Sequence, residues 1–190
     1  MPMTIDSRRR AASTLQHEHP GAVLLDVTSR GEEPWVQFSP FYPHGGIPVP
    51  FTPGVTSQSV EGIWQALKVF ASADVDPSKL TVSTMRGIKR TVRSNGQICG
   101  HREGLQGDRL LPYIEARHRI YLPSYQWVLT HRLQSLVEKM RALAVERDVV
   151  LLDYTTNGDV DDVSAPLSHA ALVKLYLDDA WPGGDRHVPR

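Results

Sequence analysis

Residues 59–70 read Ser-Val-Glu-Gly-Ile-Trp-Gln-Ala-Leu-Lys-Val-Phe and are the most informative stretch of the chain. Apolar side chains recur in this stretch at the spacing of an α-helix, which predicts a helix over residues 59–71 with one buried face. Ser57 or Ser59 is the expected N-cap, and Glu61 falls in the first turn, where a carboxylate interacts favourably with the helix dipole. The predicted buried stripe consists of Val60, Ile63, Trp64, Leu67 and Phe70.

The polar side chains of the same segment fall on a second face. Glu61, Gln65 and Lys68 are spaced i, i+4 and i+7, so they share one side of the predicted helix. A solvated surface is the simplest interpretation of such a face. The preceding segment, Phe-Ser-Pro-Phe-Tyr-Pro over residues 38–43, favours another. Aromatic rings on a proline-stiffened loop beside polar helical side chains can hold a flat ring, so we predict a polar pocket within residues 35–70. The candidate pocket walls are Phe41, Tyr42 and Trp64.

Further elements are predicted from apolar runs and their period. Short apolar runs between turn-forming residues predict strands at 22–27, 35–38, 80–83 and 149–154. Helical periodicity predicts one long helix over 123–147, opened by Pro123, and another over 166–177. The chain lacks the regular alternation of strand and helix that builds a doubly wound sheet. We therefore predict an α+β fold that is rich in helices.

The remaining segments are expected to be loops or tails. Five prolines stiffen residues 40–53, and residues 85–110 are polar, basic and dotted with glycine, with room for one hairpin. We predict a single domain over residues 21–181. A flexible N-terminal tail over 1–20, which contains three consecutive arginines, and a flexible C-terminal tail over 182–190 are expected to flank it.

Composition excludes several classes of protein. The 190 residues carry 21 Lys and Arg against 21 Asp and Glu, so the net charge argues against nucleic-acid binding driven by the overall field. The one cysteine, Cys99, excludes an internal disulfide and a cysteine-rich zinc site. No apolar run approaches the ~18 residues of a membrane helix, and no secretory signal is recognisable. We therefore expect a cytoplasmic protein without membrane partners.

Segments 38–43 and 59–70 together resemble the signature of the NADAR family. In that family a Phe-Ser-Asn-Phe-Tyr/Ala-Pro segment precedes a helix that reads roughly Ser/Thr-Val-Glu-His-x-x-Gln-Ala-x-Lys-Phe. This chain keeps the aromatic loop, the Val-Glu, the Gln-Ala and the Lys at matching spacing, and residues 117–143 resemble a later helix of the family. It departs at Pro40, where the family has Asn, and at Gly62, where the family has His. The family's C-terminal Trp-Gly and Gly-x-Asn-x-Leu-Gly patterns are also absent.

The resemblance implies a NADAR-like α+β fold and an N-glycosidase. Such an enzyme would hydrolyse the C1′–N bond of an ADP-ribosylated base or a related N-riboside or nucleotide, with the polar helix residues in the active site. The transition state of this cleavage resembles an oxocarbenium ion, so Glu61 is the candidate to stabilise charge or activate water. Lys68 could instead attack C1′ if burial lowers its pKa, and Gln65 would orient water or a hydroxyl. Hydrolysis requires no organic cofactor, and we predict no metal.

The substrate implied by the resemblance would carry phosphates, and a basic segment offers partners for them. Arginine binds phosphate through two parallel hydrogen bonds, and neighbouring glycines allow close approach of the backbone. The alternative for this segment is a solvated loop. The candidate phosphate-binding residues are Arg86, Lys89, Arg90 and Arg102.

The acidic loop over residues 153–162 follows a predicted strand. Its spacing does not match the EF-hand, so Asn157 or Asp159 is a better candidate for a polar substrate contact than for a cation ligand. His169 is expected to be structural. The rival to the enzyme is a non-catalytic module that binds ADP-ribose or a nucleotide, which the lost histidine and the lost C-terminal patterns favour.

Overall fold

The computed structural model describes residues 3–183. The chain divides into two compact units, the first formed by Met1–Ser39 with Leu133–Arg190 and the second by Pro40–Arg132. We had predicted a single domain over residues 21–181, without this division. Both units contain helices and short strands, so the predicted α+β class is confirmed. Among the described residues, no helix has the length and apolar character needed to cross a membrane.

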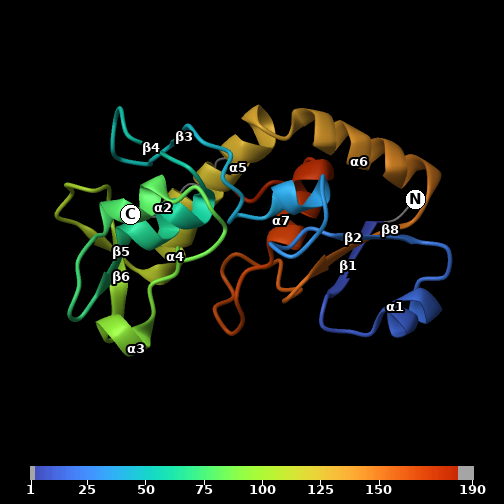
Figure 1. The fold of residues 1–190 in the computed structure, drawn as a ribbon, viewed down its shortest axis with the longest axis horizontal. Coiled ribbons are helices and arrows are strands. Elements are labelled where there is room, and N and C mark those ends of the chain that lie inside the picture. The colour runs from blue at the N-terminus through green and yellow to red at the C-terminus, as the bar shows by residue number, and fades with distance from the viewer. Residues whose placement is uncertain (1–2, 184–190) are drawn as a thin grey trace. The chain divides into compact units, whose positions relative to one another are not determined.

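A parallel three-stranded sheet organises the first unit (Figure 1). Its order is β1 (Met3–Ser7), β8 (Val149–Asp153) and β2 (Val23–Asp26), and Val149 lies opposite both Met3 and Val23. All five residues of β8 are buried, as expected for a Val-Val-Leu-Leu run at the centre of a parallel sheet. The strands predicted at 22–27 and 149–154 are thus confirmed.

The described part of the predicted flexible N-terminal tail, residues 3–20, contains regular secondary structure. It contains strand β1 and helix α1 (Ala12–Glu18). Leu15 of α1 packs against Val150 and Leu152 of the central strand, which anchors the helix to the sheet. The tail prediction was wrong because β1 is mostly polar and draws its stability from pairing with β8, which no local pattern indicates. Most of the predicted C-terminal tail, 182–190, lies outside the described residues.

The other helices of the first unit are α6 (Gln134–Glu146), α7 (His169–Leu177) and the 3₁₀-helix η1 (Trp35–Phe38). Residues 35–38 were predicted as a strand. They form a 3₁₀ turn, in which Trp35 and Phe38 stack with their ring centroids 6.3 Å apart. Residues three apart lie over one another in a 3₁₀-helix, so this short apolar run stabilises a turn instead of a strand.

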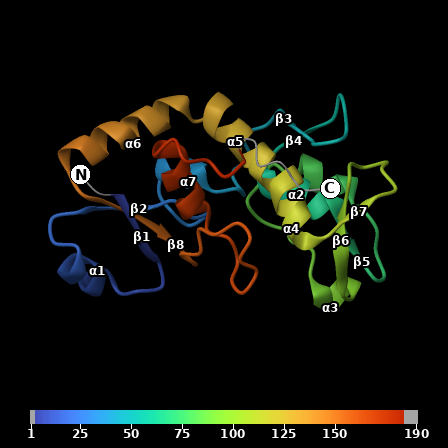
Figure 2. The ribbon, with the colours of Figure 1, turned by 180° about the vertical axis from the view of Figure 1, so that it is seen from behind.

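Two antiparallel sheets and one central helix organise the second unit (Figure 2). One sheet has the order β5 (Lys68–Phe70), β6 (Ile98–Arg102), β7 (Leu110–Leu111), and the other pairs β3 (Ile47–Pro48) with β4 (Thr56–Ser57). Helix α2 (Val60–Leu67) is buried along its whole length. The remaining elements are η2 (Pro77–Thr81), α3 (Val92–Asn95), α4 (Tyr113–Ala116), the π-helical turn η3 (Arg117–Tyr121) and α5 (Leu122–His131).

Three predictions for this unit need correction. The helix predicted over 59–71 ends at Leu67, because the next three residues pair with β6. Residues 80–83 do not form a strand, since the chain from Pro77 to Thr81 is a 3₁₀-helix. The loop predicted over 85–110 contains α3, β6 and β7.

The long helix predicted over 123–147 is two helices. Helix α5 ends at His131 and α6 begins at Gln134, at the boundary between the two units. Arg132 is the C-cap residue of α5, and its guanidinium donates to the Gly45 carbonyl at 3.1 Å and lies 5.0 Å from the centre of the Trp127 ring. The break has no glycine or proline, so helical periodicity runs through it in the sequence.

A buried ion pair joins the end of β8 to the start of α7. His169 Nδ1 lies 2.9 Å from Asp153 Oδ2, and His169 Nε2 lies 2.8 Å from the Val27 carbonyl oxygen. Both ring nitrogens face acceptors, so the imidazole must carry two protons to donate to both. Burial alone would lower the pKa of His169, but the Asp153 carboxylate and the two hydrogen bonds outweigh burial and raise it. Likewise, burial opposes ionisation of Asp153, yet its bonds to His169, Ser168 and Tyr154 lower its pKa.

This ion pair predicts the pH dependence of stability. Because the pKa of His169 is raised on folding, its contribution is fully present below about pH 6.5 and is lost as the pH rises through the folded-state pKa. The contribution of Asp153 is lost only in acid, below about pH 3.8. We expect His169→Gln to lose about 3–5 kcal/mol of unfolding free energy at pH 6 and to flatten its decline toward pH 9. Urea unfolding between pH 5 and 9, with the exposed His131→Gln as matched control, measures both. An undiminished decline in His169→Gln would refute this assignment.

Candidate functional site

The candidate site begins at the N-terminus of α2 in the second unit. Ser59 Oγ accepts a hydrogen bond from the Gly62 amide at 3.0 Å, which confirms Ser59 as the N-cap. The Glu61 amide donates to the Pro40 carbonyl at 2.8 Å, so the aromatic loop over residues 38–43 holds the first turn in place. These contacts fix the backbone from which the Glu61 side chain projects.

Glu61 and Gln65 form a buried hydrogen bond one helical turn apart. Gln65 Nε2 donates to Glu61 Oε1 at 2.8 Å, and Gln65 Oε1 accepts from the Arg90 amide at 2.9 Å. Glu61 is only 8% exposed. Burial raises the pKa of Glu61, against the opposing effects of the Gln65 hydrogen bond and of the charges on Lys68 and Lys89. The predicted polar face is therefore a buried feature of the helix, and not the solvated stripe that we weighed against it.

Lys68 follows the helix as the first residue of β5. It is 8% exposed, and its amine has no hydrogen-bond or ion-pair partner among residues 3–183. Burial lowers the pKa of Lys68, the nearby Glu61 charge opposes this shift, and Lys89 and Arg90 lower the pKa further. A buried acid and a buried amine with pKa values displaced toward neutrality are typical of functional sites.

Trp64 packs among aromatic rings beside these two groups. Its ring centroid lies 3.7 Å from that of His101, 5.8 Å from that of Tyr113 and 5.7 Å from that of Tyr121, and Lys68 Nζ lies 6.0 Å from the Trp64 centroid. Trp64 is 9% exposed. We had predicted it as a pocket wall, and the structure places it inside an aromatic cluster.

His101 is the residue of this region that sequence reasoning missed. It was read as part of a basic loop, whereas it lies in β6, is fully buried and has no hydrogen-bond partner on either ring nitrogen within the described part of the chain. Burial and the charge of Lys68 lower the pKa of His101 to about 3. The imidazole is therefore neutral. Only the pairing of β6 with β5 reveals its position, and no spacing in the sequence indicates that pairing.

The four predicted phosphate-binding residues divide into two groups. The Arg90 guanidinium donates to the carbonyl oxygens of Gln65, Lys68 and Asp74, at 3.2, 2.6 and 2.7 Å. Arg102 donates to both carboxylate oxygens of Asp74 at 3.0 Å. Both arginines thus have structural roles within the second unit.

Arg86 and Lys89, by contrast, are exposed. The Lys89 amine lies 5.2 Å from the centroid of the Phe41 ring, which brings one predicted phosphate contact and one predicted pocket wall together. The Tyr42 ring lies 4.8 Å from the His44 ring. Phe41 and Tyr42 are both partly buried.

Asn157 and Asp159 belong to the first unit, whereas Glu61 belongs to the second. Asn157 Nδ2 donates to the carbonyls of Asp162 and Ala165, and Asn157 Oδ1 accepts from the Asp159 amide at 3.0 Å. Asp159 Oδ1 in turn accepts from the Asp161 amide at 2.9 Å. These bonds give both side chains a role in shaping their own loop.

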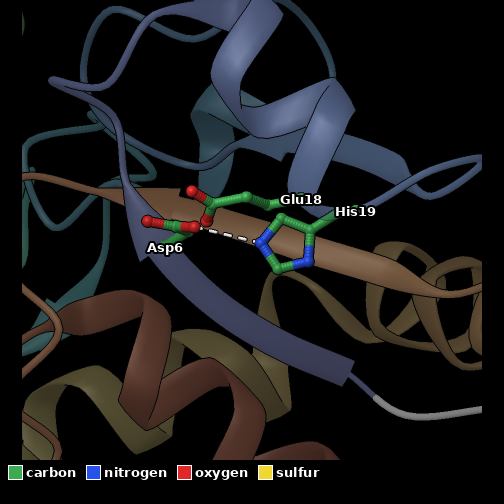
Figure 3. Close-up of side chains that lie close together, drawn as sticks. All are labelled: Asp6, Glu18 and His19. Carbon is green, nitrogen blue, oxygen red and sulfur yellow. Dashed lines mark hydrogen bonds and ion pairs between the residues drawn. The ribbon is translucent and has the colours of Figure 1, made fainter.

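Three potential metal ligands converge elsewhere in the first unit (Figure 3). Ligand atoms of Asp6, Glu18 and His19 all lie within 4.8 Å of one another, and His19 Nε2 is 3.0 Å from Asp6 Oδ2. A hollow of about 200 Å³ lies beside Glu18 and His19. The Arg10 guanidinium, however, already donates to the carboxylates of both Asp6 and Glu18. Ion pairing with Arg10 explains this cluster without a metal ion, which would have to displace the arginine.

Comparison with known proteins identifies a family. A family model described as a family of unknown function (DUF6939) matches residues 7–173. The chain belongs to DUF6939. The match begins at the end of β1 and extends into α7, so DUF6939 includes both units. No curated protein and no solved structure matches the chain.

Gly62 marks a structural difference between this DUF6939 chain and the motif that it resembles. A Cβ atom at residue 62 would lie 2.8 Å from the Lys79 carbonyl oxygen and 2.8 Å from Ser57 Oγ. Real Cβ atoms do not approach other atoms this closely, so η2 packs against α2 in the space that a histidine side chain would need. The resemblance to the NADAR family remains a prediction.

The contacts of Arg90 lead to a prediction about stability. Arg90→Ala would leave the carbonyls of Gln65 and Lys68 without their donor at the end of α2, so we expect a loss of about 1–3 kcal/mol in unfolding free energy. Arg86→Ala, which removes an equal charge from the exposed surface, should change stability by no more than about 0.5 kcal/mol. Urea unfolding of both variants tests this. Equal losses would mean that the Arg90 contacts do not stabilise the helix end.

Proposed function

We propose that this DUF6939 protein is an N-glycosidase that hydrolyses the C1′–N bond of an ADP-ribosylated base or a related N-riboside. The observation that carries the proposal is the buried Glu61–Gln65 hydrogen bond beside the unpartnered amine of Lys68. Two titratable groups whose environments displace their pKa values in opposite directions are suited to exchange protons with a reacting bond near neutral pH. The NADAR resemblance supplies the substrate class.

The proposed reaction needs one acid–base group near C1′. Water adds across the C1′–N bond: its oxygen joins C1′, its proton goes to a carboxylate, and the departing nitrogen receives a proton. Glu61 can perform both transfers, and its raised pKa keeps a fraction of it protonated for the leaving group. Gln65, which is fixed by Arg90, restricts the carboxylate to one orientation.

Lys68 offers a second route to the same products. Its lowered pKa increases the fraction of free amine, which can attack C1′ as the C1′–N bond breaks and form an imine with the opened ribose. Water then hydrolyses the imine and releases the amine. In this route Glu61 protonates the departing nitrogen.

A non-catalytic module that binds ADP-ribose or a nucleotide is the second candidate. The structural roles of Arg90 and Arg102 favour it, because they leave Arg86 and Lys89 as the predicted phosphate contacts on the exposed surface. Gly62, where the resembled motif has histidine, favours it too.

The test is hydrolysis of ADP-ribosylated nucleobases and N-ribosides by the wild type, Glu61→Gln and Lys68→Ala. We expect each substitution to lower kcat by about 10²-fold or more, since each removes a group that transfers a proton or attacks C1′. Chromatography of the released base measures the rate.

Glu146→Gln is the matched control for Glu61→Gln, because it neutralises an exposed carboxylate at the end of α6. It should leave the rate unchanged. Binding of ADP-ribose without turnover by the wild type would support the binding module, and neither binding nor turnover would reject both functions.

A further inference from the structure

His101 presents an anomaly that the fold does not explain. The ring is fully buried, and neither Nδ1 nor Nε2 has a hydrogen-bond partner within residues 3–183. A neutral imidazole offers one N–H donor and one acceptor nitrogen, and leaving both unmet in a protein interior costs free energy. Such a group in a folded protein points to a partner that the static contacts do not include.

The antiparallel pairing of β5 and β6 puts the Lys68 side chain next to His101. Lys68 lies directly opposite His101 in the register, and directly opposed residues project from the same face with their Cβ atoms about 4.5–5.5 Å apart. The Trp64 ring covers the imidazole at 3.7 Å and also lies 6.0 Å from Lys68 Nζ. The amine and the imidazole therefore both lie beside the Trp64 ring, and the imidazole has no hydrogen-bond partner in the described part of the chain.

We propose that His101 is the positioning residue of Lys68: its unprotonated ring nitrogen accepts a hydrogen bond from the amine, directly or through one bound water. The flexible lysine side chain can rotate to reach such a partner. A buried bridging water needs two or more polar partners, and the amine and the imidazole provide two. The pairing satisfies both groups at once. It also holds the amine beside the Trp64 ring, which both residues contact.

A hydrogen bond to His101 acts on the protonation of Lys68 together with the charged groups that surround the amine. Glu61 acts on the amine from α2, while Lys89 and Arg90 act from the segment before α3. Of these, only Glu61 favours the ammonium form. A neutral imidazole that accepts from the amine favours the ammonium form as well, so removal of this acceptor shifts the titration of Lys68 to lower pH. A role in catalysis for the Lys68 amine held by His101 rests on the function proposed above. The His101–Lys68 pairing itself does not.

Chemical modification of Lys68 tests the proposal without any substrate. The rate of acetylation of Lys68 by acetic anhydride is measured against pH by peptide mass spectrometry, with the exposed Lys139 in the same molecule as reference. His101→Phe keeps a ring against Trp64 but removes both nitrogens. We expect it to lower the pH at the midpoint of the Lys68 acetylation curve. Labelling of Lys68 at pH 7 should then rise about tenfold for each pH unit of the shift. His101→Gln, which retains an acceptor, should return the midpoint toward that of the wild type.

An unchanged midpoint in a folded His101→Phe protein would overturn the proposal. Nitrogen NMR of the His101 ring provides a second test should that variant not fold. In the wild type one ring nitrogen should carry the shift of a hydrogen-bond acceptor, and Lys68→Met should move that shift, whereas no movement would refute the pairing. Neither measurement involves turnover. The His101–Lys68 pairing can therefore be refuted or supported independently of the glycosidase proposal.

Discussion

Complete burial of α2 is the constraint on which the rest of the second unit depends. A helix without a solvated face must satisfy every polar group that it carries from inside the protein. Gln65 therefore donates to Glu61 and accepts from the backbone of Arg90, and the Arg90 side chain takes the carbonyls at the end of the helix. Gly62 allows η2 to pack closely against the first turn. The same packing that stabilises the unit thus creates the environment of the candidate site.

Two buried histidines have pKa values shifted in opposite directions, although burial lowers the pKa of both, and the difference lies in their partners. His169 has a carboxylate on one nitrogen and a carbonyl on the other, so it is held as a cation even though it is buried. His101 has neither and is held neutral, beside a lysine whose charge it would repel if it were protonated. The first is a structural link between β8 and α7. The second packs against Trp64, and neither of its ring nitrogens has a hydrogen-bond partner among the described residues.

The charged residues of the predicted site fall into two groups that differ in their contacts. Arg90 and Arg102 are bound to carbonyls and to Asp74, so their positive charge contributes to the fold. Glu61 and Lys68 are both buried, and each charge shifts the pKa of the other group. This separation is the reason that the proposed chemistry is assigned to the short stretch from residue 61 to residue 68 and not to the basic segment as a whole.

Local patterns in the sequence predicted several elements and contacts correctly. The apolar runs of β2 and β8 predicted strands, and Ser59 was one of the two predicted N-caps of α2. The spacing of Glu61 and Gln65 placed them on one helix face, where they form a hydrogen bond. Only the tertiary structure decided where α2 ends. Lys68 continues the helical pattern in the sequence, but pairing with His101 draws it into a strand.

The same distinction applies to the polar strand β1, to the break between α5 and α6 and to the burial of His101. Periodicity and capping act over a few neighbouring residues, and they are therefore readable from the sequence. Strand pairing and desolvation act between segments far apart in the chain, so their outcome is known only once the whole unit has packed.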